Sequence, residues 1–340
     1  MSDINNLEIY DSLIFPKNLE IPKRSRLFHL EPIGVGTPFT ESLSSYLCRL
    51  AQEHCVTPQK LIMGEIAPLL MGDKYNSEML SKNVSTLFGN SDGKPALNGM
   101  REMTKSLVDV LEKLTLRQNL KFLSCLSWKG IIKERGLFRQ NKAWCPQCFE
   151  QWRREEKAIY EPLIWSFKDI NFCPQHQCQL VDICLNCGSS LKMIANSLQL
   201  GFCYRCKAWL GISKSENQAL LIDDFESELQ VITGIGDLIA ITPDLNLSPT
   251  LPNLTRKLQL IHFCFERVEN QDLTKFLTLG KIMEQLKITL TQHYDKPLHL
   301  TKLLIPVCVH AQISLAQFLR EDFQALSAIL FKNLEINYKL

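Results

Sequence analysis

Hydrophobic positions repeat at helical spacing early in the chain, after an opening that has no such period. Residues 1–36 mix apolar and charged side chains irregularly and are predicted to form an N-terminal arm. From Thr40 the apolar residues recur every three or four positions, which predicts a helix capped by Thr40 or Thr37. Its predicted buried face consists of Phe39, Leu43, Tyr46, Leu47, Leu50 and Ala51.

A break in this period indicates a tight turn between two short helices. Residues 54–56 interrupt the pattern, and Thr57 with Pro58 then supplies a capping hydroxyl and a proline at the first helical position. Two helices joined in this way fit a helix-turn-helix, although many small helical bundles show the same spacing. Residues 37–142 are therefore predicted to form a helix-turn-helix domain.

Further helical patterns flank a cysteine-rich centre. A helix before it would bury Met103, Leu107, Val110, Leu111 and Leu114. After it, residues 213–241 form an acidic helical stretch, and residues 242–252 a proline-rich linker. Three later apolar faces complete a C-terminal helical domain over residues 213–340: Leu258, Ile261, Phe265 and Val268; Phe276, Leu279, Ile282, Met283 and Leu286; Leu315, Phe318 and Leu319. The predicted fold class is mainly α with small zinc ribbons.

Composition and charge narrow the class of protein. The 340 residues are 45% hydrophobic and 22% charged, which is typical of soluble globular proteins. The N-terminus lacks the pattern of a signal peptide, and no apolar run is long enough to span a bilayer, so we expect a cytoplasmic protein without a membrane partner. Because the formal net charge is only +2, any contact with nucleic acid must depend on a local basic patch.

The cysteine-rich centre contains pairs of metal ligands separated by two residues. A two-residue gap lets both ligands of a turn face one ion, and two such pairs complete a tetrahedral zinc site. Taken in chain order, the pairs predict two zinc ions: one held by Cys145, Cys148, Cys173 and His176, the other by Cys184, Cys187, Cys203 and Cys206. Both sets fill all four positions with protein, so the zinc ions would be structural. Residues 143–212 are predicted to form a tandem zinc-ribbon region.

The remaining cysteines and the known catalytic motifs add little. Cys178 lies two residues after His176 and is an alternative fourth ligand, but the two-residue gap favours His176. Five cysteines are predicted to be small buried apolar residues: Cys48, Cys55, Cys125, Cys264 and Cys308. The sequence has neither a Walker A lysine nor a His-Glu-x-x-His motif. Gly89-Asn-Ser-Asp-Gly93 matches the Gly-x-Ser-x-Gly spacing, but residues 89–95 are predicted to be a loop and lack the strand and helix that a nucleophilic serine of this motif requires. Neither a catalytic residue nor an enzymatic activity is therefore predicted.

A basic segment before the cysteines has two interpretations. Between Lys121 and Lys142 the cations are interleaved with Phe122, Trp128 and Phe138, and the only carboxylate is Glu134. Cations among aromatic rings suit a phosphate backbone with stacked bases, and the predicted contacts are Lys129, Lys133, Arg135 and Arg139. The alternative is a solvated basic face whose aromatic residues enter the core.

An ordered set of motifs resembles the TniQ/TnsD family over roughly residues 25–210. Its members here are Pro38–Leu43 with Tyr46 and Arg49–Ala51, Leu126–Trp128, Arg135–Arg139, Ala143–Cys148, Tyr160–Trp165, Cys173–His176 and Cys184–Cys187. The resemblance implies a target-selection adaptor of Tn7-like transposons, with an N-terminal helix-turn-helix, tandem zinc ribbons and no catalytic activity. Members of this family bind TnsC, the AAA+ regulator of transposition.

Members of this family differ in how they recognise the integration target. TnsD-type members read an attachment-site DNA sequence, whereas TniQ of CRISPR-associated transposons joins an RNA-guided effector. The length and helical C-terminus resemble the type associated with the Cascade effector. The expected partners are thus TnsC, a Cascade complex with its guide RNA, and target DNA, with a homodimer left open. The alternatives are a TnsD-like sequence-specific DNA binder and, from another class, a zinc-dependent nucleic-acid hydrolase.

The N-terminal arm is predicted to dock on TnsC. Residues 1–30 carry apolar side chains without a sustained period, and a mobile apolar arm suits insertion into the cleft of a partner. The resemblance also implies contacts between the N-terminal segment and TnsC. The alternative is an arm that folds back over the helix-turn-helix, with Phe28 and Leu30 completing its core.

Overall fold

Helices dominate the computed structural model, which describes residues 24–76, 78, 97–211, 225–245, 249–268 and 273–336. These residues contain isolated β-bridges but no sheet, so the mainly helical fold class is confirmed. The α-helices are α2 (Leu43–Glu53), α3 (Pro58–Leu61), α4 (Ala67–Met71), α6 (Glu102–Thr115), α7 (Pro146–Arg154), α8 (Phe225–Ile241), α9 (Leu251–Phe265), α10 (Leu273–Gln292), α11 (Ile305–His310), α12 (Leu315–Arg320) and α13 (Phe323–Asn333). The short 3₁₀ and π segments are η1 (Ile62–Ile66), η2 (Gly72–Lys74), η4 (Leu120–Leu123), η5 (Leu126–Trp128), η6 (Leu163–Ser166), η8 (Thr242–Asp244) and η9 (Leu300–Leu304).

The first two helices form as the pattern predicts, but with a different cap on α2. Ser42 caps this helix, because its backbone is extended and its hydroxyl accepts a hydrogen bond from Ser45 N at 3.3 Å. The predicted cap Thr40 instead donates its hydroxyl to Gly34 O at 2.9 Å. Thr57 caps α3, as predicted. Helix α3 then continues through η1 into α4.

The later part of the predicted arm, from residue 24 on, folds back onto these helices. Leu27 is buried beside α6, and its amide donates to Leu114 O at 2.9 Å. Tyr46 donates its hydroxyl to Leu30 O at 3.0 Å. Phe28 was predicted to complete the core, but its side chain is 52% exposed and stacks on His54, with ring centroids 4.1 Å apart. Leu27 therefore takes the core position, and residues 1–23 lie outside the described residues.

Helix α6 closes the N-terminal core with Leu107, Leu111 and Leu114. Met103, predicted on the same face, is 37% exposed, since it lies in the first turn of the helix, where its side chain reaches solvent. Residues 194–200 from the cysteine-rich region pack against this core. The N-terminal helices and the later coil thus share one apolar cluster.

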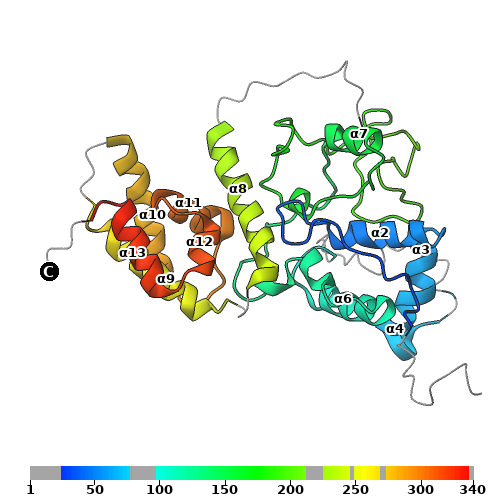
Figure 1. Ribbon diagram of the computed structural model, residues 1–340, viewed down its shortest axis with the longest axis horizontal. Coiled ribbons are helices and arrows are strands. Elements are labelled where there is room, and N and C mark those ends of the chain that lie inside the picture. Colours follow the sequence, from blue (N-terminus) through cyan, green and yellow to red (C-terminus); the bar gives the residue numbers. More distant parts are fainter. Residues whose placement is uncertain are drawn as a thin grey trace, which may run out of the picture.

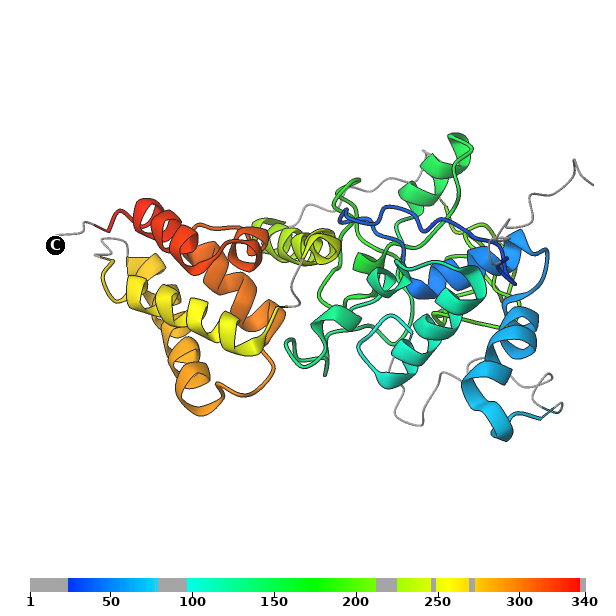
Figure 2. The ribbon, with the colours of Figure 1, turned by 60° about the horizontal axis from the view of Figure 1, so that its bottom comes forward.

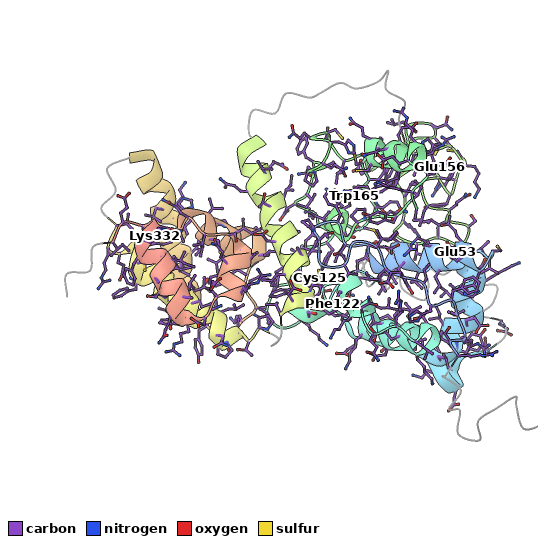
Figure 3. The ribbon with its side chains drawn as sticks, in the orientation of Figure 1. Glu53, Phe122, Cys125, Glu156, Trp165 and Lys332 are labelled. Carbon is purple, nitrogen blue, oxygen red and sulfur yellow. The ribbon has the colours of Figure 1, made fainter. Side chains whose placement is uncertain are left out.

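Helix α8 lies between the C-terminal helices and the rest of the molecule (Figures 1 and 2). It packs against η6 on one side and against α11 and α12 on the other. Figure 3 labels Phe122 and Cys125 near the C-terminal end of this helix, where Trp128 Nε1 donates to Thr242 Oγ1 at 2.9 Å. The apolar core therefore continues from the cysteine-rich region through α8 into the C-terminal helices.

The C-terminal helices bury the predicted faces. Leu258, Ile261 and Phe265 are buried on α9, and Leu315, Phe318 and Leu319 on α12. On α10 the predicted face buries Leu279, Ile282 and Leu286. The side chain of Phe276 lies outside the described residues. The predicted linker over residues 242–252 is shorter than expected, because α9 begins at Leu251 with Pro252 in its first turn.

Four of the five remaining cysteines are buried, but Cys55 is exposed. Cys55 lies in the turn after α2 with φ of 55°, so the left-handed backbone carries its side chain to the surface. Burial raises the pKa of Cys48 to about 12 and also raises the pKa values of Cys125 and Cys308. Buried thiols with raised pKa values are unreactive. None of the helices in the described part of the chain has the length and apolar character to cross a bilayer.

Candidate metal centres

Three turns of the same shape present the cysteines of the central region. In each, the amide four residues after the first cysteine donates to that cysteine's carbonyl: Gln177 N to Cys173 O at 2.8 Å, Gly188 N to Cys184 O at 2.7 Å, and Lys207 N to Cys203 O at 2.8 Å. Gln177, Gly188 and Lys207 have positive φ angles of 49°, 68° and 63°. The left-handed residue reverses the chain, so both ligands of the pair face the same point.

The first pair is presented by a helix instead. Cys145 is the N-cap of α7, with Pro146 in the first turn, and its sulfur accepts a hydrogen bond from Cys148 N at 3.4 Å. Proline fits this position because its missing N–H would be unpaired in any case. A helix N-terminus also favours the thiolate form of a nearby cysteine.

These turns bring four predicted ligands together in the first cluster. The sulfurs of Cys148 and Cys173 lie 3.5 Å apart, and His176 Nδ1 lies 3.2, 3.6 and 3.7 Å from the sulfurs of Cys148, Cys145 and Cys173. A tetrahedral zinc with Zn–S bonds of about 2.3 Å places its sulfur ligands about 3.8 Å apart. A disulfide would need about 2.05 Å. The donor set and its spacing therefore fit a metal ion such as zinc.

A hydrogen bond with Gln151 orients the ring of His176 in this cluster. The side-chain Oε1 of Gln151 lies 3.0 Å from His176 Nε2, so the Nε2–H donates outward and Nδ1 keeps its lone pair for a metal. Cys178 lies 3.5 Å from Cys145 at the edge of the cluster. The four ligand atoms within 4.8 Å of one another are those of Cys145, Cys148, Cys173 and His176, the set favoured by the two-residue gap.

A second cluster of four cysteines follows in the chain. Cys184 and Cys206 have sulfurs 3.7 Å apart, and Cys187 and Cys203 have sulfurs 3.8 Å apart. A hydrogen bond with Asn186 is the main cause that lowers the pKa of Cys206 to about 6. In the first cluster, hydrogen bonds with Cys145 and Cys148 lower the pKa of Cys173. In the same cluster a hydrogen bond with Cys148 raises the pKa of Cys145, so neighbouring sulfurs shift one another's pKa values in opposite directions.

Aromatic side chains fill the space beside the first cluster. Trp152 stacks on Tyr160 with centroids 4.5 Å apart, and Phe149 meets Trp165 edge to face at 5.7 Å. Trp165, labelled in Figure 3, belongs to η6, which lies between α7 and α8 in the chain. Isolated β-bridges, such as those between Trp144 and Val181 and between Ile183 and Ser190, join the loops of this region, and the aromatic packing supports them. Four protein ligands leave no open position for substrate, so the clusters suit structural metal.

A buried polar network joins the N-terminal helices to this region. Glu41, which is fully buried, accepts hydrogen bonds from Arg49 Nε at 3.0 Å, Arg49 Nη2 at 2.7 Å, Ser45 Oγ at 3.1 Å and Ile33 N at 3.2 Å. Ser45 Oγ in turn accepts from Glu161 N at 3.0 Å. The residues at positions 41, 45, 49 and 161 therefore bind the segment before α2 to the segment before η6.

A second buried ion pair lies beside this network. Lys142 Nζ lies 2.5 Å from Glu161 Oε1, and both side chains are at least nine-tenths buried. Nearby, Asn98 Nδ2 donates to Ser44 Oγ at 3.0 Å and to Ser166 Oγ at 2.9 Å. Buried charges and amides are tolerated when they are paired in this way. These polar side chains therefore join the N-terminal helices to η6 and the segment before it.

Comparison with protein families matches TniQ over residues 32–180, the range that holds this polar network and the first metal cluster. Residues 32–180 are a TniQ domain. A search of curated proteins finds no match to the chain. TniQ is a family of Tn7-like transposition proteins that are generally non-catalytic. The second cluster lies beyond the matched range.

Only some of the cations predicted to contact nucleic acid are exposed at the surface of the TniQ domain. Arg139 points inward, where its Nε donates to Phe167 O at 3.0 Å and its Nη2 to Ile170 O. Lys129 pairs with the exposed Glu102. Lys133 and Arg135 remain exposed at the surface. Trp128 and Phe138 are buried, so neither ring is open to a base.

Sequence reasoning missed several of these partners. Lys142 was counted with the surface cations, but Glu161 holds it in the core. Gln151, which orients His176, carries no motif, and its only sequence signal is its place one turn after Cys148 on a helix that begins at a cysteine. The left-handed position after each second ligand is visible in sequence only at Gly188.

Proposed function

We propose that this chain is a non-enzymatic adaptor in RNA-guided DNA transposition. It links a Cascade-type CRISPR effector, with its guide RNA, to the AAA+ regulator TnsC, and so selects the integration site. The observation that carries the proposal is the TniQ domain over residues 32–180. The Cascade partner rests on the resemblance of the chain to the CRISPR-associated members of the family.

The proposal includes two structural zinc ions. One would be held by Cys145, Cys148, Cys173 and His176, the other by the second cluster of four cysteines. Zinc at these sites would fix the loops of a region that has no sheet, and its binding free energy would contribute to folding. With four protein ligands at each site, zinc would have a structural role and activate no water.

The N-terminal arm is kept as the TnsC docking element. Residues 1–22 lie outside the described residues, while Leu27 is buried in the N-terminal core. A deletion of residues 1–22 therefore removes the proposed docking segment and leaves the folded segment in place. We expect the deleted protein to keep its thermal stability and zinc content, and to bind the targeting complex without recruiting TnsC.

The experiment that tests the adaptor role compares two binding reactions. Retention of the chain on an immobilised Cascade complex, followed by retention of TnsC, supports the proposal. Specific binding of an attachment-site duplex in the absence of any CRISPR complex would favour the TnsD-like alternative. Loss of TnsC retention in the deletion variant, with zinc content unchanged, locates the docking element in residues 1–22; unchanged retention excludes it.

A further inference from the structure

A cavity of about 430 Å³ lies where the C-terminal helices meet the TniQ domain. Lys133 of the TniQ domain lines one side, and the end of α10, the turn over residues 293–298 and η9 line the others. The two parts are joined at this place by backbone hydrogen bonds, from Lys133 N to Leu298 O at 2.9 Å and from Leu298 N to Ile131 O at 2.7 Å. The walls of the cavity are therefore fixed relative to one another.

The lining of this cavity is basic. Lys133, Lys296 and Lys302 come from three different segments, and no carboxylate lines the cavity. Glu134, the acidic neighbour of Lys133, accepts a hydrogen bond from Met100 N at 2.9 Å and faces Arg101 instead. Asp295 belongs to the turn but is not part of the lining. The three lysine charges are thus gathered without a balancing acid in the wall.

Two of the three lysines, Lys133 and Lys296, contact histidines. Lys133 Nζ donates to His299 Nε2 at 3.1 Å, and Lys296 Nζ donates to His293 Nδ1 at 3.1 Å. An imidazole ring carries no negative charge, so these contacts orient the two lysines and do not neutralise them. Burial, followed by the charges of Lys133 and Lys302, lowers the pKa of His299, as expected for a site crowded with cations.

We propose that this cavity binds the phosphate backbone of a nucleic acid. Ammonium groups that converge from three segments match a phosphate, which accepts hydrogen bonds from several directions. Arg135, exposed two residues beyond Lys133, extends the positive charge away from the cavity, and no carboxylate of the described residues forms an ion pair with it. A row of cations suits the repeating charge of a backbone.

An exposed aromatic ring favours nucleic acid over an acidic peptide. Tyr294 lies in the turn between His293 and Lys296, and its side chain is 63% exposed. Ile288, which lines the cavity, is 39% exposed. Bases stack on exposed rings while cations hold the phosphates, whereas a carboxylate peptide would make no use of the ring. The inference deepens the nucleic-acid contact predicted from the basic segment and replaces Lys129 and Arg139 by Lys296 and Lys302.

The test measures binding of the zinc-loaded full chain to labelled nucleic acids over a series of salt concentrations. The probes are a duplex DNA, a single-stranded DNA and an RNA hairpin of similar length, with polyglutamate as the acidic-polymer arm. The variant carries Lys133→Ala, Lys296→Ala and Lys302→Ala, all at exposed positions. A charge-matched control carries Lys105→Ala, Lys281→Ala and Lys287→Ala, also exposed and outside the cavity.

Each lost phosphate contact lowers the dependence of log K on log salt by about 0.9 for duplex DNA and about 0.7 for single strands. We expect the cavity variant to lose about 2 to 3 in slope and on the order of a hundredfold in affinity near 0.1 M salt, while the control loses less than about 1 in slope. Replacing the same three lysines by arginine should restore most of the affinity.

The probe that shows this loss identifies the bound nucleic acid. The inference is overturned if the wild-type chain binds none of the nucleic acids, if the cavity and control variants lose equal slope, or if only polyglutamate binding falls. The assay contains neither TnsC nor a CRISPR complex, although the biological setting of the site rests on the proposed function. Failure here and failure of the adaptor role are therefore separate results.

Discussion

Arg49→Ala should destabilise the TniQ domain strongly, because it leaves a buried carboxylate without its cation. Glu41 is fully buried, and the Arg49 side chain is only 9% exposed. The substitution removes two of the four hydrogen bonds that Glu41 accepts, and also the bond from Arg49 Nη2 to Glu31 O at 2.5 Å. Removing one partner of a buried ion pair costs about 3–5 kcal/mol.

A second variant separates the lost charge from the lost packing. In Glu41→Gln with Arg49→Met the site carries no charge, so we expect it to recover at least about 1.5 kcal/mol relative to Arg49→Ala. Lys129→Ala is the control, since its ion pair with Glu102 is exposed, and no measurable change is expected.

Hydrogen exchange measures the effect locally, which suits a chain whose parts need not unfold together. The amides of Glu41 and Ser42 donate to Ile33 O at 2.8 Å and to Glu161 O at 2.9 Å, so they report directly on this joint. A loss of 3 kcal/mol or more should speed their exchange by about a hundredfold or more. Equal acceleration in the single and double variants would refute the argument from the unpaired charge.

The remaining predictions concern the metal clusters and the folded part of the arm. Cys148→Ser should lower the zinc content from about two ions per chain to about one, whereas Cys178→Ser should retain both; elemental analysis of the purified variants decides between the two candidate ligands. Zinc should be released as pH falls from 7 to 5, because protons compete with the metal for thiolate and imidazole, so stability from zinc is lost on the acid side; a zinc-sensitive dye would detect this, and unchanged content would argue against thiolate ligation. Leu27→Ala should cost about 2–4 kcal/mol and Phe28→Ala less than about 1.5 kcal/mol in chemical denaturation, since only Leu27 is buried; equal costs would contradict the fold-back.

Local patterns in the sequence predicted much of the helical fold and the grouping of the cysteines. The two-residue spacing of ligand pairs is a property of a single turn, so Cys184 and Cys187 could be paired without knowledge of the fold. The period of Leu258, Ile261 and Phe265 likewise describes one face of one helix. Both patterns depend on residues at most four positions apart, so they can be recognised in the sequence without knowledge of the tertiary fold.

The basic segment was harder to interpret because the partners of its cations are distant in sequence. Arg139 meets the carbonyl of Ile170, Lys142 meets Glu161, and Lys133 meets His299 more than 160 positions away. No local pattern distinguishes a lysine that will be buried in an ion pair from one that will reach solvent. The cap of α2 was misassigned for a related reason, since the hydroxyl of Thr40 is taken up by the preceding loop.

Recruitment of TnsC to the targeting complex tests the proposed adaptor role most directly. Cascade with guide RNA and target DNA would be immobilised, and TnsC added with and without this chain, both as the full protein and as the deletion of residues 1–22. The adaptor role predicts that TnsC is retained only when the full chain is present and that the chain itself leaves the DNA uncut. Equal retention of TnsC without the chain, or cleavage of the DNA by it, would contradict the account.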